Sequence, residues 1–453
     1  KISCRYCFNR KLLDSCRYYA ICLQTIFTLN VMKGIKRRQF LAATATTMAF
    51  PFVGRVLGAN NKLNLGVVGV SGRGAGNLKG VSGENIVALC DVSAGNLAGA
   101  SVKYPKAKTY SDFRKMLEQK DLDAVVCSTP DHTHAIVGVS ALKSGRHLYC
   151  EKPLAHTVSE VRAMTEAAKK HRRVTQMGNQ IHSGENYRRV VELVQSGAIG
   201  SVDEVHVWAA AKYGNINLTA SDAPIPEGLD YDLWLGPLAY RPFRKEYAPF
   251  AWRHFWDFGG GTLADFWCHY SDLAHWALDL SHPLTVHSKV GKARPARVTS
   301  TMRVEYTYPA RGKKPPVKLI WYQGDERPPG LTLKPGQFNS AVLFVGDKGK
   351  LISNYGRHEL WPADQFKDFK RPPKTIPDSI GHHAEWIKAC KEGGKSATDF
   401  SYSGPLTECA LLGIVSHRIG NKKLDWDWKS MTAKGMPEAD RYIRHQYKAG
   451  WAL

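Results

Sequence analysis

From Leu63 onward the chain alternates short apolar runs with segments of helical composition. The apolar runs are LNLGVVGV (63–70), NIVALCD (85–91), DAVVCS (123–128) and RHLYC (146–150). Helical segments are expected between and after them, among them 135–142 and 158–171. Uninterrupted apolar strands separated by helices indicate a parallel sheet, because the crossover helices cover both of its faces. The sequence therefore predicts an α/β fold that starts with a doubly wound parallel sheet.

The first apolar run ends in a glycine-rich turn made of Gly69, Val70, Ser71, Gly72, Arg73 and Gly74. Gly69 would allow a tight turn and Gly74 close helix packing, while Ser71 stands where a dinucleotide-binding turn usually has glycine. Gly72 could supply the missing freedom. The amino end of the next helix would offer N–H groups to a pyrophosphate. The alternative is a glycine-rich loop in an unrelated α/β fold.

Asp91 ends the second apolar run, 22 residues after Gly69. A carboxylate at this place binds the ribose hydroxyls of a dinucleotide and repels a 2′-phosphate. The predicted cofactor is therefore NAD, with NADP less favoured.

Two later loops also follow strands of this sheet, and the carboxyl ends of parallel strands share one ligand-binding edge. We therefore expect both loops to line the cofactor, together with the GNQ segment at 178–180. The residues are Ser128, Thr129, Pro130, His132 and His134 of CSTPDHTHA, Glu151 and Lys152 of EKP, and Asn179 and Gln180. The two histidines lack helical spacing and no cysteine or carboxylate cluster completes a set of ligands, so no metal site is predicted.

The Glu151-Lys152-Pro153 tripeptide would place an amine at the nicotinamide end of such a crevice. Lys152 could donate a hydrogen bond to a substrate oxygen, and Glu151 could hold the Lys152 side chain. Pro153 would fix the turn, with a cis peptide as one option. The alternative is a surface ion pair that caps a strand.

The second half has strand-like segments without helices between most of them, at 201–210, 284–291, 298–308, 317–324 and 341–354. This arrangement predicts a large antiparallel sheet. The first two strands are separated by a long insert, 213–278, that is rich in Trp and Tyr. Because sugars pack their C–H faces on aromatic rings, the insert could cover a substrate.

The end of the insert, 262–278, is predicted to be a helix. Asp265 and His269 are four residues apart and share one helix face, and Asp272 lies one turn further along. These groups form either a site or a satisfied core network. We favour a site because the same chain carries EKP and a nucleotide-binding pattern.

Residues 62 to about 450 resemble the Gfo/Idh/MocA family of oxidoreductases. The resemblance rests on the glycine turn, Asp91, STPDHTH, EKPLA, GNQ, and D-x-x-x-H within WDFGGGTLADFWCHYSDLAHWAL. It implies an amino-terminal Rossmann domain (60–180) and a carboxyl-terminal α/β domain (181–453) with a large, open, mostly antiparallel sheet. It also implies NAD(P)-dependent chemistry at a carbon of a sugar or cyclitol, and dimers or tetramers formed through that sheet.

For the chemistry, we expect His269 to act as general base, because an imidazole titrates near neutral pH. Asp265 would orient that imidazole or hold an adjacent hydroxyl, and Lys152 would stabilise the negative charge that develops on the reacting oxygen. Further substrate contacts are expected from Asp272, His182, Tyr187 and Arg188.

Two other functions stay open. Some family members are glycosidases that oxidise a sugar carbon, eliminate the glycosidic substituent and re-reduce, with NAD recycled. The protein could also be a non-catalytic sugar-binding or regulatory module that retains the fold. The presence of Lys152, Asp265 and His269 argues against a non-catalytic module.

The amino terminus is expected to lie outside the fold. Residues 1–31 precede the first Met and are interpreted as an upstream extension. Residues 32–59, with Arg37 and Arg38 ahead of a weakly apolar stretch, resemble a twin-arginine export signal, which predicts a periplasmic protein. The apolar stretch is too short for a membrane span. A basic amphipathic segment on a cytoplasmic protein is the alternative.

The formal net charge is +23, but the basic residues are scattered along the chain. We therefore expect a solvated surface with a weak preference for acidic partners and no nucleic-acid ligand. Of the ten cysteines, Cys4 and Cys7 have C-x2-C spacing without a second pair, and the six beyond residue 60 sit mostly in apolar runs as expected for buried thiols.

Overall fold

The computed structural model describes residues 61–453, apart from 218–220, 249–250 and 335. The predicted extension (1–31) and export signal (32–59) lie outside the described residues. No helix in the described part of the chain has the length and apolar character needed to cross a membrane.

The first half folds around a six-stranded sheet in which every strand pair is parallel. The strands are β1 (Asn64–Val68), β2 (Asn85–Cys90), β3 (Lys108–Tyr110), β4 (Ala124–Cys127), β5 (His147–Cys150) and β6 (Thr175–Met177). Their order is β3-β2-β1-β4-β5-β6, so the direction of winding reverses between β1 and β4. Ligands of such sheets bind at that reversal, outside the carboxyl ends of the strands. The predicted doubly wound sheet is confirmed.

Helices connect these strands, namely α3 (Arg73–Gly80), α4 (Ala94–Lys103), α5 (Phe113–Leu117), η1 (Asp131–Thr133), α6 (His134–Lys143) and α7 (Val158–His171). The sequence sets the ends of α7 closely. Thr157 accepts a hydrogen bond from the Glu160 backbone and Glu160 caps the Thr157 backbone in return, and Arg172 ends the helix in a left-handed conformation. The predicted helix 158–171 has these same bounds.

The second half contains a nine-stranded sheet of order β13-β12-β11-β7-β10-β9-β8-β14-β15. The strands are β7 (Val202–Ala209), β8 (Thr285–Val290), β9 (Met302–Tyr308), β10 (Val317–Gln323), β11 (Ala341–Gly346), β12 (Gly349–Ser353), β13 (His358–Trp361), β14 (Leu424–Asp427) and β15 (Thr432–Ala433). Only the β7–β10 pair is parallel among the described strand pairs. The sheet is thus mixed and mostly antiparallel.

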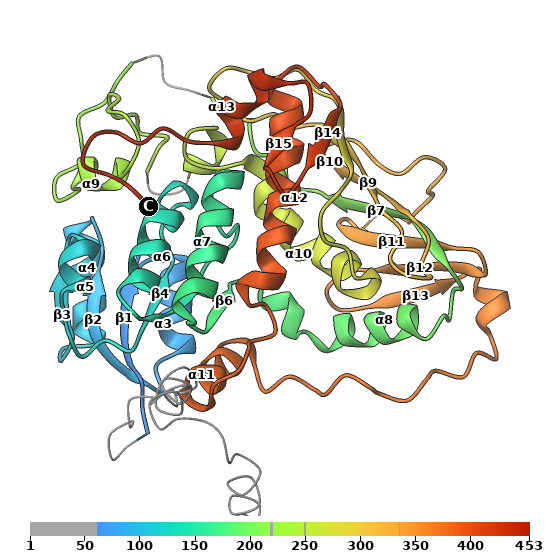
Figure 1. Cartoon of the computed structure of the whole chain (residues 1–453), viewed down its shortest axis with the longest axis horizontal. Coiled ribbons are helices and arrows are strands. Elements are labelled where there is room, and N and C mark those ends of the chain that lie inside the picture. Colours follow the sequence, from blue (N-terminus) through green and yellow to red (C-terminus); the bar gives the residue numbers. More distant parts are fainter. Residues whose placement is uncertain (1–60, 218–220, 249–250, 335) are drawn as a thin grey trace, which may run out of the picture. The chain divides into compact units, whose positions relative to one another are not determined.

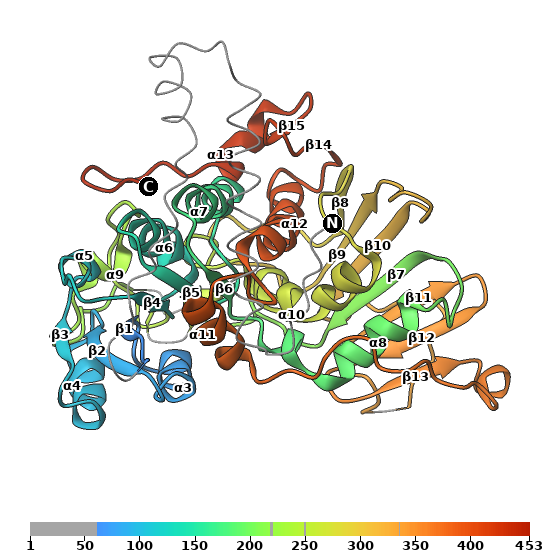
Figure 2. The ribbon, with the colours of Figure 1, turned by 60° about the horizontal axis from the view of Figure 1, so that its bottom comes forward.

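The helices of the second half are α8 (Glu185–Gln195), α9 (Tyr231–Leu235), α10 (Gly261–Leu278), α11 (His382–Glu392), α12 (Phe400–Arg418) and α13 (Asp440–Ile443), with short turns η2 (Gln180–Ser183), η3 (Ala251–His254), η4 (Ala363–Phe366) and η5 (Pro437–Ala439). Helix α10 packs against α8, α12 and β7, and α12 packs against α7. In Figures 1 and 2, α10 and α12 lie between the two sheets. Helix α10 therefore reaches from the large sheet to the edge of the parallel sheet.

Candidate active site

A cavity of about 670 Å³ opens at the carboxyl edge of the parallel sheet. Both halves of the chain line it. The first half contributes Gly69, Ser71, Gly72, Arg73, Asp91, Ser128, Thr129, Pro130, Glu151, Lys152 and Gln180, all predicted to lie at a cofactor. The second half contributes residues that include Asp265 and His269 of α10.

The glycine turn joins β1 to α3 at the floor of this cavity. Gly69 has φ 80°, and Gly72, the N-cap of α3, has φ 51°, so both adopt left-handed conformations that suit glycine. Gly74 does not line the cavity. A Cβ on Gly74 would lie 1.8 Å from the Gly69 carbonyl oxygen, so its role is to let α3 pack close to the turn.

Asp91 follows β2 and is fixed by the backbone around it. One carboxylate oxygen accepts a hydrogen bond from the Val70 N–H at 3.0 Å, and the other accepts one from the Ser93 N–H at 2.9 Å. The carboxylate therefore stands beside the glycine turn, where the ribose of a dinucleotide would be expected.

Glu151 is buried and ties the EKP loop to α3. Its Oε1 accepts hydrogen bonds from Arg73, Asn77 and Gln180, each at 3.0 Å. Burial opposes ionisation, but Arg73 and Lys152 lower the pKa of Glu151 below its usual value. The expectation that Glu151 holds the Lys152 side chain is corrected, because the partners of this carboxylate lie mainly on α3 and η2.

Lys152 reaches across to α10. Its Nζ donates to the Asp265 carboxylate and, at 3.1 Å, to the Asp265 carbonyl oxygen. The other carboxylate oxygen accepts from the Tyr213 hydroxyl at 2.9 Å, and the Arg253 guanidinium lies 3.4 Å from the carboxylate. Although burial would raise it, the pKa of Asp265 is lowered by Lys152 and Arg253. The peptide bond between Lys152 and Pro153 is cis.

His269 lies one helical turn after Asp265 and lines the same cavity. Its Nδ1 is buried and has no hydrogen-bond partner among the described residues. Burial, with a smaller effect of Lys152, lowers the pKa of His269 to about 3. The imidazole is therefore neutral at ordinary pH, but it is a weaker base than an ordinary imidazole. This corrects the expectation that His269 titrates near neutral pH.

The expected contact between Asp265 and His269 is not found, since no hydrogen bond joins these two side chains in the described part of the chain. Spacing of four residues puts both on one helix face. It does not decide which partner each takes, and the ammonium of Lys152 attracts the carboxylate more strongly than a neutral imidazole does.

His132 and His134 do not line the cavity, which corrects their predicted place at the cofactor. His132 donates from Nε2 to the Trp234 carbonyl at 2.8 Å. Both ring nitrogens of His134 lie 2.8 Å from carbonyl oxygens, those of Pro153 and Thr129. His134 thus holds the two cofactor-side loops together from below.

One group with metal-ligand spacing occurs within the described ranges, namely the buried Cys127, His134 and Cys150, whose ligand atoms lie within 4.8 Å of one another. His134 could bind a metal there only by giving up one of its carbonyl bonds. This group therefore fits a structural core better than an ion site.

Four other predicted residues are buried and do not line the cavity. Asp272 accepts from Asn179 at 3.1 Å, from His182 at 3.0 Å and from Tyr402 at 2.7 Å. Tyr187 donates its hydroxyl to the His269 carbonyl at 3.0 Å. Asn179 was predicted at the cofactor and the other three at the substrate. These side chains bond to groups inside the protein, so they support α10 and η2 instead.

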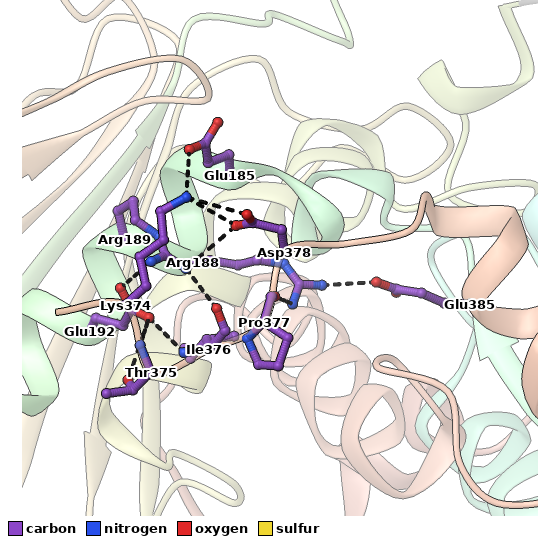
Figure 3. A network of polar contacts seen from close by, with 10 residues as sticks. All are labelled: Glu185, Arg188, Arg189, Glu192, Lys374, Thr375, Ile376, Pro377, Asp378 and Glu385. Carbon is purple, nitrogen blue, oxygen red and sulfur yellow. Dashed lines mark hydrogen bonds and ion pairs between the residues drawn. The ribbon is translucent and has the colours of Figure 1, made fainter.

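Arg188 also lies outside the cavity. It donates to the Pro377 carbonyl at 2.7 Å and to Glu385 at 2.9 Å, within a polar network that fastens residues 374–378 to α8 (Figure 3). The neighbouring Glu192 accepts from the backbone of Thr375 and Ile376 in the same network. Arg188 therefore anchors a connecting segment, and its expected contact with substrate is corrected.

Several cavity residues were not predicted. Trp234, Trp252 and Arg253 come from the insert, and Trp451 comes from the carboxyl-terminal tail. The dense WRHFW run at 252–256, which ends two residues before three glycines, was a signal that could have found two of them. The sequence around Trp451 carries no comparable signal.

This fold and cavity define a two-domain protein that binds a dinucleotide on its first domain and closes the site with its second. Residues 63–179 match a family model described as oxidoreductase family, NAD-binding Rossmann fold, and residues 183–453 match the carboxyl-terminal α/β domain of that family. The chain belongs to the Gfo/Idh/MocA oxidoreductase family.

Individual relatives agree with this assignment. An inositol 2-dehydrogenase of Salmonella typhimurium is 34% identical over 150 residues, which cover 32% of this chain and 45% of that protein. A glycosyl hydrolase family 109 protein of Saccharopolyspora erythraea is 34% identical over 157 residues, covering 32% of this chain and 34% of that protein. The chain thus spans less than half the length of these curated relatives.

Among solved structures, the WlbA dehydrogenase from Bordetella pertussis, in complex with NADH and UDP-GlcNAcA, superposes with a TM-score of 0.59. The match has 18% sequence identity and covers 81% of this chain and 99% of that one. At this identity the likeness concerns the fold alone.

Proposed function

We propose that the protein is an NAD-dependent oxidoreductase that transfers hydride at a secondary alcohol or ketone carbon of a sugar or cyclitol. The observation that carries the proposal is the convergence of Lys152, from the β5 loop, and His269, from α10, on one cavity that starts at the glycine turn. The residues fit NAD, because the glycine turn can bring backbone N–H groups close to a pyrophosphate and the Asp91 carboxylate can accept hydrogen bonds from ribose hydroxyls. When bound, NAD supplies the hydride acceptor.

The protein's own groups manage the proton and the charge. Neutral His269 is placed to accept the hydroxyl proton of the substrate. Its lowered pKa keeps the ring unprotonated at ordinary pH and also makes it a weaker base than an ordinary imidazole. Lys152 donates a hydrogen bond to the same oxygen as negative charge develops there. Asp265 is a positioning residue, since it holds the ammonium of Lys152 at the cavity wall.

The substrate class is supported by the relatives. One is named an inositol 2-dehydrogenase, which is a cyclitol enzyme by its name. The aromatic lining from Trp234 and Trp252 is suited to the C–H faces of a sugar ring.

The test is NAD-linked turnover of the purified protein on a panel of sugars and cyclitols, followed as NADH formation. Lys152→Ala and His269→Ala should each lower kcat at least about a hundredfold, because each removes a group that acts only in the transition state. Lys388→Ala, an exposed lysine on α11, is the control and should leave turnover unchanged. If Lys152→Ala and His269→Ala both keep the turnover of the wild-type protein, the assignment is refuted.

A second candidate is glycoside cleavage through transient oxidation and elimination. One observation favours it, the relative named as a glycosyl hydrolase family 109 protein. Analysis of the products separates the two functions. Release of an aglycone from a glycoside without net NADH formation supports cleavage, whereas accumulating NADH and an oxidised sugar support the dehydrogenase.

For cellular context, we propose export through the twin-arginine route and assembly into a dimer or tetramer. The support is the paired Arg37 and Arg38 in the segment 32–59 and, for the assembly, membership of the family. Export of a reporter fused to this segment should be lost when both arginines become lysine. Light scattering of the purified protein would measure the assembly, and a monomer would contradict that part.

A further inference from the structure

The carboxyl-terminal tail returns to the first domain and places Trp451 on the wall of the cavity. The indole ring centroid lies 6.3 Å from that of Phe113, the first residue of α5. The Arg114 guanidinium carbon lies 4.5 Å above the Trp451 ring. A flat aromatic surface is therefore held at this end of the cavity by two residues that follow β3.

The strand order shows which end this is. In the order β3-β2-β1-β4-β5-β6, Phe113 follows β3, Asp91 follows β2, and Lys152 follows β5. Neighbouring strands lie about 4.8 Å apart, so Trp451 stands on the order of 19 Å from the β5 end. The glycine turn after β1 lies between them. A dinucleotide with its pyrophosphate at that turn and a ribose at Asp91 would bring its adenine towards Trp451.

The tail is fixed in this position through the insert. The Lys448 N–H donates to the Pro237 carbonyl at 2.9 Å, and the Lys448 ammonium pairs with Asp232 of α9 at 2.5 Å. Figure 1 shows the carboxyl terminus beside α6 and α9. These bonds attach the carboxyl-terminal tail to the insert, so the position of the insert determines the position of the tail.

The insert is in turn paired with the loop that carries Asp91. The Ala94 N–H donates to the Gly228 carbonyl at 2.8 Å, and the Asp230 N–H donates to the Val92 carbonyl at 2.9 Å. The β2–α4 loop, the insert and the tail thus form a continuous wall around the end of the cavity next to Asp91.

We propose that Trp451 binds the adenine of the dinucleotide, so that the tail of the second domain completes the cofactor site of the first. This inference rests on the proposed NAD-dependent function. An indole offers a flat apolar face for base stacking, and such stacking contributes about 1–3 kcal/mol per base, which is about five- to 150-fold in affinity.

Calorimetric titration with two halves of the cofactor tests the inference directly. The probes are ADP-ribose, which contains the adenine, and reduced nicotinamide mononucleotide, which lacks it. Trp451→Ala should raise the Kd for NADH and for ADP-ribose about tenfold and leave the Kd for the mononucleotide unchanged. Trp451→Phe keeps an aromatic face and should retain most of the affinity.

The control is Trp428→Ala. Trp428 is exposed, lies next to β14 and is outside the cavity, so this variant should leave the Kd for NADH, for ADP-ribose and for the mononucleotide unchanged. If Trp451→Ala fails to fold, Trp451→Leu removes the aromatic face, keeps apolar bulk and should show the same loss. Unchanged ADP-ribose affinity in the folded variant, or equal weakening of both probes, overturns the inference and leaves the oxidoreductase proposal standing. A wild-type protein that binds neither NADH nor ADP-ribose contradicts both.

Discussion

At the scale of single residues, the neighbours Glu151 and Lys152 bind partners on opposite sides of the EKP loop. Successive side chains of an extended chain point to opposite sides. Glu151 turns inward to Arg73 and Asn77, whereas Lys152 crosses to Asp265, which is 113 residues away. The sequence located both residues at the end of a strand. It could not assign their partners, because the nearest charged neighbour in sequence is not the nearest in space.

Glu151→Gln should destabilise the protein by about 2–3 kcal/mol, measured as the free energy of unfolding in urea. Oε1 accepts from Arg73, Asn77, Gln180 and, at 3.4 Å, Tyr149, and the charge that balances Arg73 is lost in the variant. If the amide oxygen takes the place of Oε1, the NH₂ group takes the place of Oε2 and meets the Lys152 N–H, which is also a donor.

Glu392→Gln is the matched control for this change. Glu392 pairs with Lys388 on the exposed face of α11, where an ion pair contributes about 0.5 kcal/mol or less. Equal stability of the two variants would show that the buried network contributes no more than the surface pair.

At the scale of elements, predictions succeeded where the local signal was strong. The capping residues of α7 lie within its own sequence, and the predicted bounds were correct. The segment 341–354 was predicted as one strand, but it forms β11 and β12 joined at Asp347 and Lys348. The flanking Gly346 and Gly349 were the turn signal that the strand pattern concealed.

Gly74→Ala should destabilise the protein by about 2 kcal/mol and weaken NADH binding at least about tenfold. The new methyl group would overlap the Gly69 carbonyl, which is backbone, so α3 must move away from the glycine turn. Urea unfolding and NADH titration measure the two effects.

Gly76→Ala in the same helix is the control, because its Cβ would meet no atom within 4 Å. This variant should gain about 0.5–1 kcal/mol from the helix preference of alanine. If both alanine variants behave alike, close packing is not the reason for glycine at position 74.

At the scale of the whole molecule, the two-domain α/β fold followed from the strand pattern and from the family resemblance. The contacts that close the site between the two domains could not be predicted in this way. The β5 loop contacts α10, and the tail contacts the region after β3. Both contacts join segments far apart in sequence, so no local periodicity in the sequence encodes these contacts. A similar long-range effect appears in buried histidines, because His132 bonds to the Trp234 carbonyl and His156 to the Trp256 carbonyl, each about 100 residues away.

The stability of the protein should fall steeply below pH 6.5. Burial lowers the pKa to about 3 for His132, His156, His269 and His382, and to about 4 for His275. The unfolded chain binds these protons near pH 6.5, so the stabilisation is complete above that pH and is lost as the pH falls towards 3. Each such histidine contributes about 1.4 kcal/mol per pH unit.

Urea unfolding at a series of pH values measures this dependence. We expect a loss of several kcal/mol between pH 6.5 and pH 5, and little change from pH 7 to pH 8.5. A flat profile between pH 5 and pH 7 would contradict the neutral, buried state of these side chains.

The central claim is that the ammonium of Lys152 and the imidazole of His269 face the redox end of one bound dinucleotide. A crystal structure of the NADH complex tests it most directly. We expect nicotinamide between the β5 loop and α10, with its C4 atom facing a space where one substrate oxygen could lie about 3 Å from both groups. Nicotinamide bound outside this cavity, or turned away from Lys152 and His269, would contradict the claim.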